Sequence, residues 1–209
     1  MHPADPAEAE SYRILRSRLD LSALPPLSRA VTERVIHATA DFDYVTDLVC
    51  DEAALASGLA GLRRGAPAVA DATAVAAALG GYQVICKADD SLAARLARTA
   101  NLSLSAAAVR LAFSAAGPGA VWLVGSAPDA LSEILAREVE PALVIGVPVG
   151  FVGAAEAKDA LRRSGLPALS NVSEKGGPAV AAAAFEALLR IAAAVPDDPH
   201  PPFPSPGGR

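Results

Sequence analysis

The sequence predicts a single-domain α/β fold, with a doubly wound, mostly parallel sheet and helices on both faces. Short apolar segments rich in β-branched residues alternate along the chain with longer segments of helical periodicity. Glycine, proline, serine and aspartate separate these segments, which suits the turns between strands and the following helices. Strands this apolar are typical of a sheet that is buried on both faces.

The clearest strand–turn–helix unit spans residues 142–161. Residues 142–147 form an apolar run that predicts a buried strand, and Pro148 then ends the ladder. Gly150 permits a tight turn or a close approach to a ligand. Helix formers dominate from Val152 onward, so the glycine turn lies at the carboxyl end of a strand, where open α/β sheets bind ligands.

The remaining elements are predicted by the same two periodicities and by their caps. Pro128 suits the first position of a helix, and Asp90 suits the cap of another. The link over residues 72–82 is short and carries no expected element. Helices are expected over residues 7–19, 28–37, 51–64, 92–99, 106–113, 129–139 and after 178, and strands over 67–71, 83–87, 120–125 and 166–172.

Composition limits the class of protein. The chain has 209 residues, is 52% hydrophobic but only 4% aromatic, and carries a formal net charge of −5. No basic stripe indicates a nucleic-acid partner, and no apolar run is long enough to cross a membrane. Cys50 and Cys86 lack metal-site or disulfide spacing and suit a reducing compartment. Without a signal peptide, we expect a soluble cytoplasmic protein.

The two ends of the chain differ from the rest. We expect a flexible amino terminus over residues 1–6, one folded domain over 7–194 and a disordered proline-rich tail over 195–209. His200 lies in this tail and is therefore not a candidate ligand.

His37 is the candidate acid–base residue. It lies at the carboxyl end of the expected helix 28–37 and is followed by Asp41 and Asp43. The negative end of the helix dipole and the nearby carboxylates would both favour a protonated imidazole. The alternative is a purely structural histidine, because lone histidines more often serve that role.

Several serines are candidates with an equally simple alternative. Ser11 lies on the expected first helix, where it could be an exposed hydroxyl without a role. Ser103 and Ser105 precede the expected helix 106–113, so each could contact a ligand or cap that helix.

Four expected helix starts, at Ser105, Ser126, Gly153 and Gly177, would converge at one edge of the sheet. Unpaired N–H groups at such starts favour anions, each start acting as roughly half a positive charge. Arg34, Arg110 and Lys175 could add positive charge to such an edge. The sequence therefore predicts a crevice for an acidic ligand, unless the glycines only make tight turns.

Common cofactor motifs are missing. The glycines at 146, 150 and 153 do not form the Gly-x-Gly-x-x-Gly of dinucleotide sites, and no phosphate-loop lysine follows a glycine-rich loop. Metal-ligating residues are not clustered, and no Ser-His-Asp order indicates a hydrolase. We therefore expect no metal site.

Several segments together are similar to the precorrin-8X methylmutase family, known as cobalt-precorrin-8 methylmutase in the anaerobic pathway. The resemblance runs from about Glu10 to Ile191. The block over residues 146–158 is highly specific, and the block around His37 moderately so. The matching segments are Arg34-Val35-Ile36-His37-Ala38 and residues 65–67, 84–86, 125–128 and 146–158.

The resemblance implies an α/β homodimer without a cofactor, with substrate sites near the subunit interface. It implies an isomerase of cobalamin biosynthesis that moves a methyl group from C11 to C12 of precorrin-8X or cobalt-precorrin-8, giving hydrogenobyrinate or cobyrinate. His37 would protonate a pyrrole nitrogen of this many-carboxylate macrocycle and so promote a sigmatropic methyl shift. Substrate contacts would come from Ser11, Ser103, Ser105, Ser126 and Lys175.

Some positions depart from the family pattern. Leu104 and Glu174 stand where the family has arginines, Ser126 replaces an asparagine, and Pro178 replaces a serine. Because arginine binds carboxylates in a bidentate way, these changes favour weaker substrate binding. A rival hypothesis is therefore a divergent paralogue that binds a tetrapyrrole without converting it. A third, a nucleotide-binding α/β protein, would require that a nucleotide raise the melting temperature.

Overall fold

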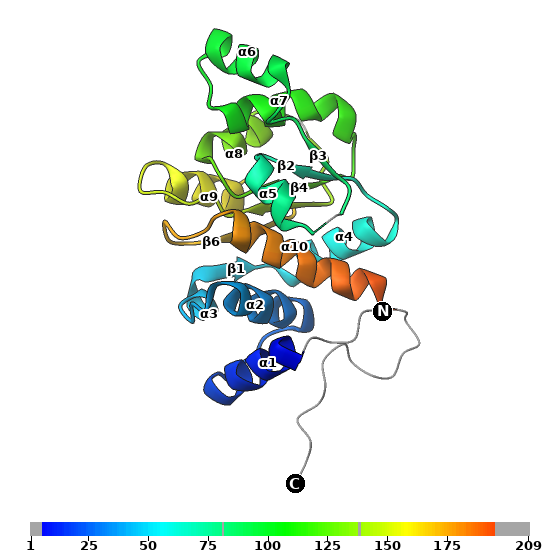
Figure 1. Ribbon diagram of the computed structural model, residues 1–209, viewed down its shortest axis with the longest axis vertical. Helices are drawn as coiled ribbons and strands as arrows, with labels where there is room; N and C mark the ends of the chain where they lie inside the picture. Colours follow the sequence, from blue (N-terminus) through cyan, green and yellow to red (C-terminus); the bar gives the residue numbers. More distant parts are fainter. Residues whose placement is uncertain (1–5, 81, 138, 195–209) are drawn as a thin grey trace.

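The computed structural model describes residues 6–80, 82–137 and 139–194 (Figure 1). Pro6 already begins the first helix, one residue earlier than expected. Residues 1–5 and the proline-rich tail over residues 195–209, both expected to be flexible, lie outside the described residues. The helices are α1 Pro6–Arg18, α2 Pro26–Thr39, α3 Tyr44–Asp47, α4 Glu52–Arg63, α5 Thr73–Ala78, α6 Ser91–Ala100, α7 Leu104–Ala116, α8 Pro128–Leu135, α9 Ala154–Arg163 and α10 Pro178–Ala193.

The strands form one sheet in the order β1-β6-β5-β4-β2-β3. Their bounds are β1 Leu48–Cys50, β2 Ala68–Ala70, β3 Val84–Cys86, β4 Val121–Val124, β5 Leu143–Gly146 and β6 Ala168–Asn171. All neighbours are parallel except β1 and β6. The prediction of a mostly parallel α/β sheet is confirmed.

Helices cover both faces of this sheet, and the side chains of the central strands alternate between two cores. Leu123 of β4 and Ile145 of β5 pack into one core with Phe185 of α10. Trp122, next to Leu123 on β4, points the other way and packs with Leu131 of α8. The first core also receives α2 and α4, and the second receives α7 and α9. Figure 1 shows α1 and α2 lying together beyond α10.

Three short elements were not expected from the sequence. They are α3, the antiparallel edge strand β1, and α5 within the link over residues 72–82. In addition, α8 ends at Leu135 rather than near residue 139, and α7 begins at Leu104 rather than 106 because Ser103 caps it. Among the described residues, no helix is long and apolar enough to cross a membrane.

The start of α10 packs tightly against the carboxyl ends of β4 and β5. A Cβ atom added at Gly125 would lie 3.0 Å from the carbonyl oxygen of Gly177. One added at Gly176 would lie 2.2 Å from the carbonyl oxygen of Val147, and its φ of +147° is a conformation that other residues rarely adopt. Glycines therefore bring these segments together at the edge where the site was expected.

Candidate functional site

His37 lies in the last turn of α2, where it meets α1. The hydroxyl oxygen of Ser11 is 2.8 Å from Nδ1 of the imidazole. The Tyr12 ring stacks on the imidazole, with centroids 4.9 Å apart and planes 10° from parallel. Tyr12 and Leu15 bury the inner side of α1, which fixes the orientation of Ser11. The two residues that the sequence placed on separate helices are therefore brought into contact.

These contacts hold one face and one nitrogen of the ring. Within the described part of the chain, Nε2 of His37 has no hydrogen-bond partner. If the Ser11 hydroxyl donates to Nδ1, the neutral ring carries its proton on Nε2. His37 is only partly buried, so part of its side chain is accessible from solvent.

The charges around His37 differ from those expected. Arg34, one turn earlier on α2, binds Glu8 of α1 at 2.7 Å and Glu186 of α10 at 2.5 Å. Partial burial of the ring lowers the pKa of His37, and the Arg34 guanidinium lowers it further. The expectation that the surroundings favour the protonated ring is wrong for the free protein.

Asp41 and Asp43 do not serve as partners for His37. Their carboxylates accept hydrogen bonds from the ammonium of Lys175, at 2.7 Å and 2.6 Å. This contact holds the pKa of Asp41 below its usual value and raises the pKa of Lys175. Lys175 therefore lies beside the carboxyl end of α2, the helix that carries His37, but with its charge already paired.

The two other cations predicted for an anion crevice are also paired. Arg34 is shared between Glu8 and Glu186. Arg110 forms a bidentate pair with Glu133, with distances of 2.7 Å and 2.6 Å. The prediction that these arginines add free positive charge to the crevice is wrong.

Ser126 follows β4, but its backbone N–H is not available to a ligand. The buried carboxylate of Asp71, directly after β2, accepts hydrogen bonds from Gly125, Ser126 and Ala127 at 3.1, 2.9 and 3.2 Å. Burial raises the pKa of Asp71, although the three N–H groups oppose this. The expected unpaired N–H groups at Ser126 are thus occupied by Asp71, which the sequence analysis missed.

Ser103 and Ser105 occupy different places at the start of α7. The Ser103 hydroxyl accepts the N–H of Ala106 at 3.0 Å and donates to Asp129 at 2.7 Å, so Ser103 caps the helix. Ser105 lies buried in the first turn and is not the helix start that was predicted. The capping alternative therefore describes Ser103 but not Ser105.

Gly153 and Gly177 do cap helices, as expected. Both have positive φ, and no side chain caps α9 or α10. The N–H of Gly177 itself donates to Val147 at 2.8 Å. Two of the four predicted helix starts thus keep first-turn N–H groups without a side-chain acceptor.

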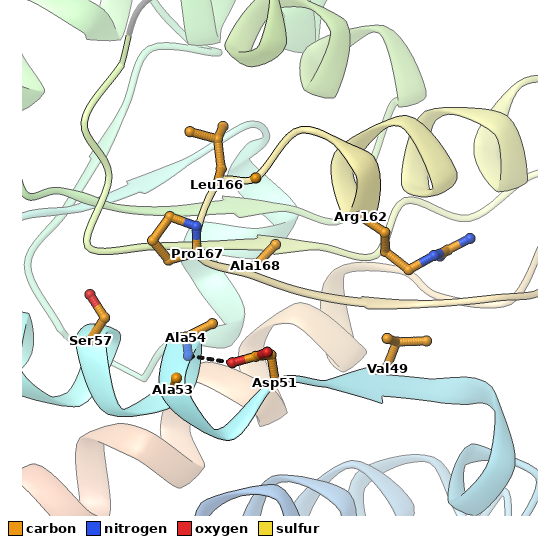
Figure 2. A pocket seen from close by; sticks show the side chains of 10 residues that line it. Val49, Asp51, Ala53, Ala54, Ser57, Arg162, Leu166, Pro167 and Ala168 are labelled. Atoms are coloured by element: carbon orange, nitrogen blue, oxygen red, sulfur yellow. Dashed lines mark hydrogen bonds between the residues drawn. The ribbon is translucent and has the colours of Figure 1, made fainter.

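A groove with a volume of about 500 Å³ lies elsewhere, at the amino end of β6. Figure 2 shows Asp51, which caps α4, and Ala53, Ala54 and Ser57 of α4 across the groove from residues 166–168, with Arg162 of α9 at one side. None of the residues predicted for the site lines it. Within the described ranges, no group of three or more His, Cys, Asp or Glu side chains is arranged to bind a metal ion.

Fold and site together define a doubly wound α/β protein with an oriented histidine at a helix–helix contact. The sequence profile of the precorrin-8X methylmutase family matches residues 6–191. The chain is 37% identical over 194 residues to a cobalt-precorrin-8 methylmutase of Salmonella typhimurium, covering 87% of this chain and 92% of that protein. It is 35% identical over 192 residues to a precorrin-8X methylmutase of Sinorhizobium, covering 86% and 91%.

A solved structure agrees with these relatives. The precorrin-8X methylmutase from Thermus thermophilus is 34% identical, and its structure superposes with a TM-score of 0.80 over 89% of this chain and 95% of that one. The chain belongs to the precorrin-8X methylmutase family.

Proposed function

We propose that this protein is an isomerase of cobalamin biosynthesis. It moves a methyl group from C11 to C12 of precorrin-8X or cobalt-precorrin-8, and the product is hydrogenobyrinate or cobyrinate. The family match over nearly all of the described chain and the relatives above support the reaction class.

The observation that carries the mechanism is the orientation of His37 by Ser11 and Tyr12. Nε2 donates a proton to a pyrrole nitrogen of the macrocycle, which draws electron density from the conjugated system. The C11–CH₃ bond then breaks as the C12–CH₃ bond forms, so no atom is gained or lost. The proton returns from the pyrrole nitrogen to His37 when the product forms. A positioned acid of this kind contributes about 10² to 10⁴ in rate.

The substrate supplies the charge that the free protein lacks. Partial burial and Arg34 lower the pKa of the imidazole before binding, which favours its neutral form. A carboxylate of the macrocycle within a few ångströms of the ring favours the imidazolium, because opposite charges stabilise each other in a partly desolvated site. His37 therefore becomes an effective acid only in the complex.

The other proposed contacts bind carboxylates or ring edges of the substrate. Lys175 exchanges Asp41 or Asp43 for a substrate carboxylate, which its half-exposed side chain permits. Ser103 caps α7, Ser105 lies in the first turn of that helix, and Ser126 follows β4. Ser11 acts through its contact with His37 as well as by touching the substrate.

We also infer that the folded domain over residues 7–194 works as a cytoplasmic homodimer that needs no cofactor or metal. The resemblance to the family supports this inference, and the acidic net charge fits a protein without nucleic-acid partners. Sedimentation of the purified protein at micromolar concentration tests the oligomeric state.

The decisive experiment follows the absorption spectrum of precorrin-8X or cobalt-precorrin-8 mixed with purified protein. The wild type should convert the spectrum to that of the product. The His37→Ala variant should lose at least about a hundredfold in rate. An active wild type with an equally active His37→Ala variant would exclude the proposed acid.

The rival function, tetrapyrrole binding without conversion, is favoured by two observations. Leu104 is exposed at the place of a family arginine, and Arg34 and Arg110 are both paired internally. This rival predicts tight binding of the corrin product and no spectral conversion of the precursor. Turnover by the wild type eliminates it.

A further inference from the structure

Lys158 of α9 is the one fully buried cation among the described residues, with none of its surface exposed. Its ammonium donates hydrogen bonds to Oδ1 of Asn171 at 3.0 Å, to the carbonyl oxygen of Lys175 at 2.8 Å and to that of Ser173. All three acceptors are neutral oxygens. Because a buried charge is costly unless fully bonded, this arrangement requires all three oxygens to stay in place.

The segment of residues 172–177, which carries the two carbonyl oxygens bound by Lys158, is also bound by a carboxylate. Asp47, the last residue of α3, accepts the N–H groups of Val172 and Ser173 at 3.1 and 2.7 Å. It also accepts the hydroxyl of Ser173 at 2.8 Å and the side-chain amide of Asn171 at 2.8 Å. Thus the cation binds the carbonyl groups of the segment, the anion binds its N–H groups, and Asn171 joins the two.

The position of this segment determines where Lys175 and the start of α10 lie. Lys175 extends from it to Asp41 and Asp43 at the end of α2, which carries His37. Gly176 and Gly177 then pass against Val147, leaving no space for a side chain at 176. A shift of the segment would therefore move the Lys175 ammonium and the start of α10 together.

We propose that Lys158 is a positioning residue whose buried ammonium, with Asp47 and Asn171, fixes residues 172–177 and thereby places Lys175 for substrate. The last step rests on the proposed function, because it takes Lys175 as a substrate contact. The ordering of the segment does not depend on any activity.

A simple packing role makes a different prediction. Methionine is similar in length to the lysine side chain and apolar, so Lys158→Met would preserve packing and remove only the three donors. If Lys158 merely filled space, the variant would behave as the wild type. If the ammonium fixes the segment, the variant loses order only in residues 172–177, which include Lys175.

The experiment measures amide hydrogen exchange and steady-state kinetics on the full chain. In Lys158→Met, amides of residues 172–177 should exchange about tenfold faster or more, while those of β4 and β5 keep their wild-type rates. The KM for the corrin precursor should rise about tenfold, with kcat changed by less than about threefold. Lys87→Met, at the other edge of the sheet, is the matched control and should change neither quantity.

A second variant tests the proposal independently in case Lys158→Met does not fold. Asp47→Asn keeps the size of the side chain, weakens the hold on the N–H groups, and should loosen the same segment. Uniformly faster exchange across the core in both variants would overturn the proposal, as would unchanged exchange in the segment. A loosened segment with an unchanged KM would overturn the link to Lys175. A loosened segment in a protein whose wild type converts no substrate would sustain the ordering role and refute the proposed function instead.

Discussion

The buried carboxylate of Asp71 offers a direct test of how the end of β4 is held. It lies with none of its surface exposed, and it accepts three backbone N–H groups from residues 125–127. One of its oxygens binds Gly125, and the other binds both Ser126 and Ala127. Asp71→Asn changes little in size, but it offers only one acceptor oxygen and directs an NH₂ group at a neighbouring N–H.

The expected cost is set by these contacts. An amide oxygen in place of Oδ2 keeps two hydrogen bonds but loses their charge assistance, and Gly125 is left with a buried, unpaired N–H. Such a donor costs about 1–3 kcal/mol. Burial already penalises the charged carboxylate of Asp71 and raises its pKa, so the amide recovers part of this cost. We expect a net loss of about 2 kcal/mol in the free energy of unfolding at pH 7.

Urea unfolding of both proteins measures this difference. Asp51→Asn is the matched control, because Asp51 caps α4 with a single hydrogen bond to Ala54 and asparagine caps helices equally well. The control should stay within about 0.5 kcal/mol of wild type. The effect of Asp71→Asn should grow in acid as the pH falls towards 3.8, because a carboxyl with a raised pKa binds its proton in the folded protein before the unfolded chain does, which stabilises the folded wild type. Equal stability of Asp71→Asn and wild type at pH 7 would refute this account.

Three further outcomes are expected. Ser11→Ala removes the 2.8 Å contact with His37 and should lower kcat about tenfold with little change in stability, and an unchanged kcat would contradict the orienting role. Burial lowers the pKa of Lys158 from 10.5 to about 8. Between these two pH values, Lys158 is therefore protonated in the unfolded chain and neutral in the folded chain. Unfolding free energy should therefore rise between pH 8 and 10.5, by up to about 1.4 kcal/mol per pH unit, a slope that urea titrations of Lys158→Met should lack. Gly176→Ala forces a Cβ to 2.2 Å from the Val147 carbonyl oxygen and should cost about 3 kcal/mol or more, so wild-type stability in urea would contradict this close approach.

The central sheet was predictable because its strands are buried on both faces. Residues such as those of β4 and β5 must then be apolar throughout, which is visible in the sequence without knowledge of their partners. The edge strand β1 has only three, half-buried residues and takes its conformation from pairing with β6. Its existence depends on a contact more than 100 residues away, and no local pattern reports that contact.

The site was predictable in its residue types but not in its pairings. His37 was found from its helix end, whereas its contact with Ser11 depends on how α1 packs against α2. Asp41 was predicted to interact with His37, the nearest titratable group before it in sequence, but it binds Lys175, 134 residues away. Short sequence separation favours contact only along one helix, and Asp41 lies beyond the left-handed residue that ends α2.

The electrostatics of His37 lead to a difference between two pH profiles. In the free protein, partial burial and Arg34 lower the pKa of the imidazole below its usual 6.5. The macrocycle brings carboxylates, and these favour the imidazolium once they lie beside the ring. Since kcat/KM reports the free protein and kcat the complex, we expect kcat to fall at a higher pH than kcat/KM as the solution becomes alkaline. Spectral assays over about pH 5 to 9 measure both, with His37→Ala to show which limb belongs to the imidazole. Coinciding limbs would mean that the substrate leaves the imidazole unaffected, and the proton would then have to come from another group.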